Sequence, residues 1–516
     1  MFDFVEKHPC SFTFLVCLLL FLAASIFYGS SYISDVQISY LIITGLLALG
    51  LNGFYQRIGF ILLALGGFLS FLAANTSSIG YLLGEYGILF LFILLNRTKN
   101  NIYLMAIIAA AFLLHLYYIQ ITPVNIRQHD LNGIMLYMHL ITLNGINIFN
   151  FNPWHMYYLF HQPLHFIIAG YLFSAEIYLW NSRTLAAEGL QYLSLLYVTL
   201  TTLIAAGIFK ELKITGKTFY ACVTLFAFHP TFILFSGYIS DDVPTIFWSV
   251  FIIYFIILWY KTEQSKYIAC AAIGFGVGVL TKLSVLMLVP ALCFIFIHKL
   301  FTTRENRQKI IQQLCLFIII AVPLALLWII RNHILFDMQF YNIPDTSPAG
   351  QNFKYLTLQE RIGDFSMLFQ PFINVPEVSD ANIFLALIKT ELFGEWDLSL
   401  IHPIIYWPAF ALYILNIFIK IFALAGCLLI FCNSSKHHPA VVMLVILYLT
   451  VWGYAVKYAL DYPYICSTDF RLFAQLILPE TVLLSAILAK KIKSTAFLTI
   501  TVIYAVLNCF IYIAGI

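Results

Sequence analysis

The stretch SDDVPTIFWSVFIIYFIILWYK, residues 240–261, holds an uninterrupted apolar run between two aspartates and a lysine. Residues 243–260 carry no charged side chain, and about 20 residues of helix are enough to cross the ~30 Å hydrocarbon core of a membrane. Because the lipid interior offers no partner for backbone polar groups, a run of this kind must form a helix. The stretch therefore indicates a transmembrane helix whose first turn carries two carboxylates.

The composition extends this interpretation to the whole chain. The 516 residues are 62% hydrophobic and 10% charged, which excludes a soluble globular protein. We predict an all-α polytopic membrane protein with roughly fifteen transmembrane helices. The predicted spans are residues 11–29, 38–54, 58–74, 79–96, 101–120, 187–209, 218–236, 243–260, 267–281, 284–299, 309–330, 404–431, 439–457, 472–489 and 494–514.

The basic residues predict the orientation of these spans. Lysines and arginines fall in alternate connectors, which the positive-inside rule assigns to the cytoplasm. The amino terminus is then cytoplasmic and the carboxyl terminus extracytoplasmic. Two long loops, residues 121–186 and 331–403, become extracytoplasmic and are expected to carry short interfacial helices. Residues 151–173 are interpreted as interfacial, because a further span there would place the lysine-rich loops outside.

Two broad classes of site find no support in the sequence. The ten cysteines stand singly with no CxxC spacing, so neither a disulfide framework nor a zinc ribbon is indicated. A basic stripe for nucleic-acid binding is also lacking. The glycines of GFGVG, residues 274–278, are weak evidence for a nucleotide site and fit close helix packing better.

The pair Asp241 and Asp242 calls for a chemical explanation. An aspartate before Pro244 can cap the free N–H groups of a starting helix. Capping explains one acid better than two, because adjacent carboxylates repel unless a cation, a proton or a hydrogen-bonded substrate lies between them. Both readings, capping alone and a binding site, remain open on the sequence.

Other scarce polar groups fall on the same predicted side. Asp130 follows a span beside Arg127 and His129, and is either a surface ion pair or a general base near a buried substrate. Lys282 stands isolated between two apolar runs, so it either binds an anionic lipid headgroup or extends to water.

A third polar segment precedes the span at 472–489. Arg471 offers a planar guanidinium suited to a phosphate, although Asp469 alternatively serves only to neutralise it. His161 and His165 have the i, i+4 spacing of zinc helices, but Pro163 lies between them and no glutamate follows His161. The zinc-protease pattern is therefore not met, and an aromatic interface belt is the alternative to a binding role.

In their order along the chain these features resemble the GT-C superfamily of polytopic glycosyltransferases, in the branch of protein O-mannosyltransferases and the lipid A aminoarabinose transferase. The resemblance covers residues 101–490. It is carried by Asp130, HQPL at 161–164, Asp241 and Asp242, GVLTK at 278–282, and DFR at 469–471.

The resemblance implies an inverting glycosyltransferase that moves a hexosyl or pentosyl group from a polyisoprenyl-phosphate carrier to an extracytoplasmic acceptor. The acceptor is a glycan, a lipid or a protein, and the expected setting is a bacterial inner membrane with the site on the periplasmic face. Membrane lipids and the lipid-linked donor are then the expected partners, and dependence on a divalent metal stays open.

The resemblance also implies roles for individual residues. Asp130 would be the catalytic base, and Lys282 and Arg471 would hold the lipid phosphate. The other candidate substrate-binding residues are Asp241, Asp242, Asp469, His161, His165 and Trp396. A metal, if one is used, would be held by Asp130, Asp241 and Asp242.

Two departures from the family pattern shape the predicted domains. Four spans precede the one that would be first in such enzymes, so residues 1–100 form an amino-terminal membrane extension, residues 101–490 the catalytic core and residues 491–516 the last helix. The paired acids that many relatives carry in the first loop are here a single Asp130 beside His129.

The alternative function is a transporter or flippase of a lipid-linked substrate. A transporter needs ionisable groups near the membrane midplane, whereas we expect the spans of this chain to be apolar throughout. The one-sided distribution of charge therefore favours the enzyme.

Overall fold

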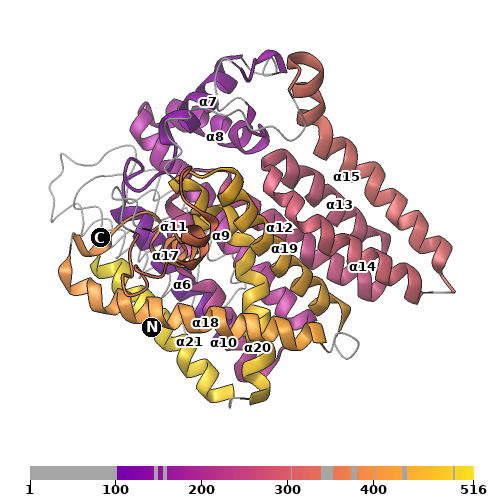
Figure 1. The fold of residues 1–516 in the computed structure, drawn as a ribbon. Helices are drawn as coiled ribbons and strands as arrows, with labels where there is room; N and C mark the ends of the chain where they lie inside the picture. Colours follow the sequence, from indigo (N-terminus) through magenta and orange to yellow (C-terminus); the bar gives the residue numbers. More distant parts are fainter. Residues whose placement is uncertain are drawn as a thin grey trace, which may run out of the picture.

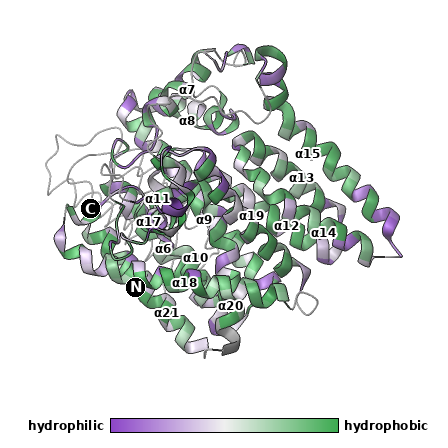
Figure 2. Ribbon diagram, in the orientation of Figure 1, coloured by the Kyte–Doolittle hydropathy of each residue, from purple (hydrophilic) through white to green (hydrophobic). Residues whose placement is uncertain are grey.

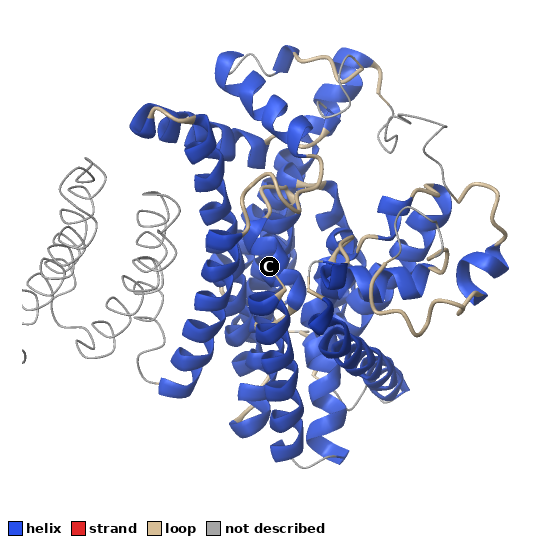
Figure 3. Cartoon of the chain, turned by 90° about the vertical axis from the view of Figure 1, so that its left-hand side faces the viewer, coloured by secondary structure: helices blue, strands red, loops and turns tan. Residues whose placement is uncertain are grey.

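The computed structural model describes residues 101–516 apart from 145–148, 155–159, 304, 339–352, 374–379, 401, 433–437, 492–493 and 516. Within these ranges all regular structure is helical, as Figure 3 shows. The amino-terminal extension, with its four predicted spans, lies outside the described residues, as do residues 155–159 of the stretch interpreted as interfacial. The fold class predicted from hydropathy is confirmed for the described part.

Figure 1 shows the helices in chain order, with short 3-10 helices (η) between some of them. The α-helices are α6 (Ile102–Ile121), α7 (Leu131–Asn144), α8 (Leu164–Trp180), α9 (Arg183–Glu211), α10 (Gly216–Ala227), α11 (Pro230–Gly237), α12 (Asp242–Thr262), α13 (Ser265–Thr281), α14 (Val289–Thr302), α15 (Arg307–Phe336), α16 (Leu358–Gly363), α17 (Ile383–Phe393), α18 (Tyr406–Cys432), α19 (Pro439–Asp461), α20 (Ile477–Lys491) and α21 (Ser494–Ala514). The 3-10 helices include η5 (Leu283–Leu288), η7 (Leu398–Leu400), η8 (Pro403–Ile405), η10 (Ile465–Thr468) and η11 (Phe470–Leu476).

The described helices account for the predicted spans of this part of the chain. Nine of them are long and apolar enough to cross a membrane, and α10 and α11 together make a tenth that is bent by 41°. The predicted span 267–281 corresponds to α13, which is shorter. The chain is therefore an integral membrane protein, while the total of fifteen spans stays a prediction because four of them precede residue 101.

The bend between α10 and α11 follows from Pro230, the first residue of α11. Proline disfavours the helical conformation in the residue before it, and His229 is indeed extended, with φ −65° and ψ 129°. Proline then suits the first turn of the new helix because it has no N–H to leave unpaired. The bend matters for the site, because α11 leads directly into the turn that carries Asp241 and Asp242.

Close helix contacts depend on glycines of α13, which packs between α12 and α15. A Cβ added to Gly276 would lie 2.5 Å from Cβ of Leu324 in α15, and one added to Gly274 would lie 2.8 Å from the Phe251 ring in α12. These distances are shorter than real contacts allow, so the glycines serve packing, as the sequence favoured.

Hydrophobic residues predominate along α13, α14 and α18, and hydrophilic residues gather near α11 and α17 (Figure 2). The outward side chains of α15 and α18 include Ile319, which is 69% exposed, and Leu428, which is 57% exposed. Large apolar groups exposed in this way are what a helix facing lipid requires.

The helices α7 and α8 lie beside the end of α15 (Figure 1). Arg331 of α15 donates from Nε to the Phe149 carbonyl over 3.0 Å and also bonds the Phe151 carbonyl. The indole N–H of Trp154 donates to the Phe336 carbonyl over 2.8 Å. These bonds anchor the loop before α8, and they direct Trp154 to α15.

We predict that Gly276→Ala destabilises the protein by about 1–3 kcal/mol, because the added methyl group overpacks the contact between α13 and α15. Gly453→Ala is the matched control, since nothing lies within 4 Å of a Cβ added there. Thermal unfolding in detergent measures both variants. Equal melting temperatures for the two would contradict the packing role of Gly276.

Candidate functional site

Two acids and a lysine form the buried centre of the candidate site. Lys282, at the end of α13, places Nζ 3.0 Å from Oδ1 of Asp241 and 2.5 Å from Oδ1 of Asp242. Asp241 and Asp242 are 5% and 3% exposed. Ser240 donates a hydrogen bond of 3.2 Å to the second oxygen of Asp242. The ammonium group therefore offsets the repulsion between the adjacent carboxylates.

This geometry tests the capping interpretation of the aspartate pair. Asp241 occupies the residue before α12, yet its side chain makes no capping hydrogen bond. The carboxylates face Lys282 instead of the helix N–H groups. Capping alone is therefore not the reason for the pair.

Arg471 joins this centre to a second group of acids. Its guanidinium lies 3.5 Å from Oδ2 of Asp242, 3.5 Å from Oδ2 of Asp130 and 3.0 Å from Oδ2 of Asp469. The Arg471 side chain is 12% exposed, whereas that of Asp130 is 54% exposed. The largely buried guanidinium of Arg471 in η11 thus contacts acids from the loop after α6, from α12 and from the residue before η11.

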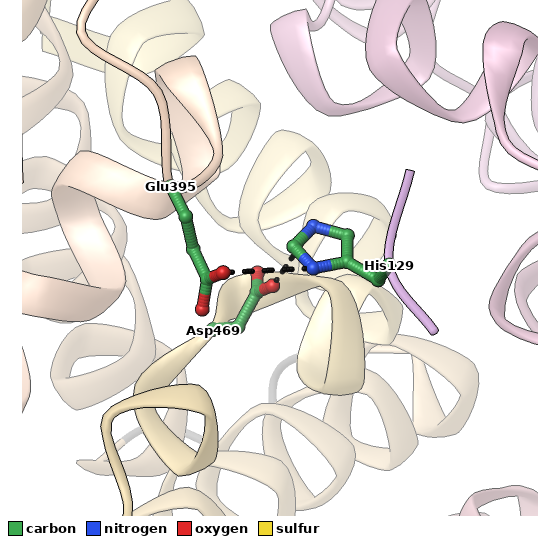
Figure 4. Close-up of side chains that lie close together, drawn as sticks. All are labelled: His129, Glu395 and Asp469. Carbon is green, nitrogen blue, oxygen red and sulfur yellow. Dashed lines mark ion pairs between the residues drawn. The ribbon is translucent and has the colours of Figure 1, made fainter. Parts of the chain in front are cut away.

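Figure 4 shows His129, Glu395 and Asp469 pointing toward one another. Nε2 of His129 lies 3.5 Å from Oδ2 of Asp469, and Nδ1 lies 3.6 Å from Oε2 of Glu395. The imidazole ring packs against Trp396 at a centroid distance of 4.9 Å and against Tyr238 at 5.4 Å. The cluster lies directly beside Arg471 through Asp469.

Burial sets the protonation of this cluster. Burial, together with the charge of Arg471, lowers the pKa of His129 to about 3. Burial, followed by the negative charge of Asp469, raises the pKa of Glu395 to about 7. His129 is therefore neutral near pH 7, while Glu395 exchanges a proton in that range. The site contains a carboxyl group whose protonation changes at physiological pH.

The described residues hold one group with the spacing of metal ligands, and it differs from the predicted set of Asp130, Asp241 and Asp242. One ligand atom each from His129, Glu395 and Asp469 lie within 4.8 Å of one another. However, Nε of Arg471 is 3.0 Å from the Asp469 oxygen that faces His129. A divalent cation there would face the guanidinium charge, so the residues fit a neutralised acid cluster better than a metal centre.

The predicted histidines lie on the other side of Asp241. Nδ1 of His161 is 3.8 Å from Oδ2 of Asp241, and burial lowers the pKa of His161. Nε2 of His165 contacts the Ile239 carbonyl at 3.1 Å. His161 therefore borders the acid pair, whereas His165 contacts the backbone that leads to it.

The site residues predicted from the sequence do not include His129, Tyr238 or Glu395, which the structure brings to this site. Each adjoins or precedes a segment that was singled out, since His129 is next to Asp130 and Glu395 is next to Trp396. Their proximity to each other was not visible, because nothing in the spacing relates the loop after α6 to the loop after α17.

The expectation that the spans are apolar throughout is wrong. Lys420 lies in α18 and Glu480 in α20, and Nζ of Lys420 is 2.5 Å from Oε2 of Glu480. Both belong to helices of membrane-spanning length. Hydropathy averaged over a long window hides single charges, so this second charged cluster escaped notice.

The segment from α8 to α15 matches a known protein family. A model of the family described as dolichyl-phosphate-mannose-protein mannosyltransferase matches residues 170–338. The matched segment contains Asp241, Asp242 and Lys282, whereas Asp130, Glu395, Asp469 and Arg471 lie outside it. No curated protein matches the chain. The match confirms the resemblance to GT-C glycosyltransferases that the order of motifs predicted.

We predict that Glu395→Gln weakens the pH dependence of stability. The folded state raises the pKa of this carboxyl group from 4.5 to about 7, so it favours the protonated form. Its stabilising effect is complete below pH 4.5 and is lost as the pH rises through about 7. The melting temperature of the wild type should therefore fall between about pH 5 and pH 8 more steeply than that of the variant.

Glu305→Gln is the control for this measurement, because Glu305 is exposed and should leave the wild-type pH slope unchanged. The same slope in Glu395→Gln and in the wild type would contradict a raised pKa of Glu395.

Proposed function

We propose that this membrane glycosyltransferase transfers a mannosyl group, with inversion, from a polyisoprenyl-phosphate carrier to a hydroxyl group outside the cytoplasm. The observation that carries the proposal is the convergence of Lys282 and Arg471 on Asp242, at 2.5 and 3.5 Å. The family match supports the sugar, since the family is described by a dolichyl-phosphate-mannose donor and a protein acceptor.

The two cations are suited to a departing phosphate. Arg471 presents a planar donor fork and Lys282 a compact charge, and their side chains are 12% and 17% exposed. Before the donor binds, the aspartates hold both cations in place. The lipid phosphate then competes for the same charges, and cations already oriented toward it stabilise the negative charge that develops on the leaving oxygen.

The reaction is one displacement. A carboxylate takes the proton of the acceptor hydroxyl, and the acceptor oxygen forms a bond to the anomeric carbon. The bond from that carbon to the phosphate oxygen breaks, and its electron pair leaves on the lipid phosphate. The step needs a base for the acceptor hydroxyl and cations for the departing phosphate.

Asp130 is the proposed base. It is the most exposed acid that contacts Arg471, at 54%, so an acceptor can reach it. Its backbone has a φ of 56°, a left-handed conformation that non-glycine residues adopt mainly under local constraint. Asp241 and Asp242 are proposed to orient sugar hydroxyls, with Trp396 beside His129 as an apolar wall.

We also propose on which side of the membrane the reaction takes place and which acceptor it uses. By the positive-inside rule the site faces the extracytoplasmic side, which for a bacterial inner membrane is the periplasm. A protein hydroxyl is the acceptor that the family description favours. Comparing the glycoproteins, lipids and polysaccharides of cells with and without the gene product identifies the acceptor, and an unchanged profile in all three would contradict sugar transfer.

We predict that Asp130→Asn lowers the transfer rate by about 10²–10⁴-fold, because the amide cannot take the acceptor proton. Transfer from a radiolabelled polyisoprenyl-phosphate mannose in proteoliposomes measures the effect. Asp337→Asn is a matched control, since Asp337 is also exposed and has a φ of 53°. Normal transfer by Asp130→Asn would remove Asp130 from the role of base.

We predict that Lys282→Ala raises the KM for the donor by about tenfold or more and changes the KM for the acceptor less than twofold, because only the donor carries the phosphate. The comparison uses the monodisperse fraction, because the variant removes the lysine that pairs with both buried carboxylates. Lys261→Ala, in a pair with Glu211 at the other end of α12, is the control. A larger effect on the acceptor would overturn the phosphate role.

A further inference from the structure

The structure contains a second buried charge cluster, separate from the candidate site. Lys420 places Nζ 2.6 Å from Oε1 of Glu391 and 2.5 Å from Oε2 of Glu480. Asn416 donates a hydrogen bond of 2.9 Å to Oε2 of Glu391. Exposures are 8% for Lys420, 0% for Glu391 and 4% for Glu480. Charges buried this deeply are costly unless paired, so the cluster binds α17, α18 and α20 together.

The cluster reaches the candidate site through Phe470. The His229 ring is stacked on the Phe470 ring at 6.3 Å and 22°, and Nε2 of His229 lies 3.0 Å from Oε1 of Glu391. Nζ of Lys420 lies 5.1 Å from the centroid of the Phe470 ring, within the range of a cation–π contact. The side chain of Phe470 is thus held between two members of the cluster.

The backbone of the same segment is held by Thr390, the residue before Glu391. The Phe470 N–H donates to the Thr390 hydroxyl over 3.0 Å, and that hydroxyl lies 3.2 Å from the Thr468 carbonyl. The Glu391 carbonyl in turn accepts a bond of 2.8 Å from Thr231 in α11. Helix α17 is therefore hydrogen-bonded to α11 through the Glu391 carbonyl and to η11 through the Thr390 hydroxyl.

We infer that Thr390 and Lys420 are positioning residues for the candidate site. Phe470 lies between Asp469 and Arg471, so whatever holds its backbone and ring determines where those two side chains point. The intramembrane cluster, through Thr390 and Phe470, keeps the Arg471 guanidinium within reach of Asp130, Asp242 and Asp469. The inference rests on the proposed function for its catalytic consequence, because a displacement of about 1 Å at a reacting centre costs on the order of 10²-fold in rate.

Ion transport is the competing role for charged groups within spans. The described contacts favour positioning, because Lys420 contacts both acids directly and Asn416 and His229 bind Glu391. A positioning role predicts a local change in η11 when one link is removed. A transport role predicts a change in ion flux.

The decisive variant is Thr390→Val, which keeps the shape of the side chain and removes the acceptor of the Phe470 N–H. Hydrogen exchange of peptides covering residues 468–476 should rise by about tenfold or more while other helices keep wild-type exchange. Thr199→Val is the matched control, since Thr199 is buried and its hydroxyl bonds only within α9, to the Leu195 carbonyl at 2.7 Å. Unchanged exchange in this segment would overturn the inference.

A kinetic readout tests the catalytic consequence. Thr390→Val should raise the donor KM by about fivefold or more without changing the acceptor KM, because Arg471 faces the donor phosphate. Phe470→Leu, which removes the ring contacts of His229 and Lys420, should give the same pattern. Wild-type donor KM in both variants would overturn the inference. Hydrogen exchange needs no sugar transfer, so it tests positioning even if the proposed function fails.

A flux measurement addresses the competing role. In proteoliposomes with an entrapped pH dye, the wild type and Lys420→Met should show the same proton flux. A flux that is lost in Lys420→Met and retained in Lys261→Ala would assign the cluster to translocation and overturn positioning.

Discussion

The structure depends on the neutralisation of Asp241 and Asp242 by Lys282. Two adjacent carboxylates with exposures of 5% and 3% cannot both stay ionised in a poorly solvated place without a cation between them. That requirement fixes the start of α12 against the end of α13. It also places one lysine and two carboxylates together at the end of these two helices.

The protein uses buried charge in two different ways. Around Lys282 and Arg471 one acid, Asp130, is exposed, and Glu395 exchanges a proton near neutral pH. Around Lys420 the charges are enclosed among α17, α18 and α20. The first cluster thus includes one exposed carboxylate, whereas the second joins three helices. Phe470 touches the second cluster, and its neighbours Asp469 and Arg471 form part of the first, so this residue links the two clusters.

The sequence predicted the fold well where one physical effect dominates. Apolar runs at least as long as a membrane is thick admit only helices, and the described helices follow those runs. The scarcity of charge also made Asp241, Asp242, Lys282 and Arg471 conspicuous, and the structure brings these four together. The order of these residues carried the family resemblance, which the match over residues 170–338 supports.

Other features could not be predicted because they depend on tertiary contact. Glu395 meets His129 only when the loop after α17 folds over the loop after α6, and no local pattern records that meeting. The charges of Lys420 and Glu480 were visible in the sequence, yet they were hidden in averages over long apolar runs. Their pairing required knowing that α18 packs against α20. Pro230, by contrast, was a visible signal for the bend between α10 and α11 that hydropathy alone does not use.

The most direct measurement is an experimental structure of the protein with a polyisoprenyl phosphate bound in lipid nanodiscs. The account predicts that the phosphate lies within hydrogen-bonding distance of both Nζ of Lys282 and the guanidinium of Arg471, with Asp130 facing the space where the sugar would sit. A phosphate bound at the opposite end of the bundle, or at a place that touches neither cation, would contradict it.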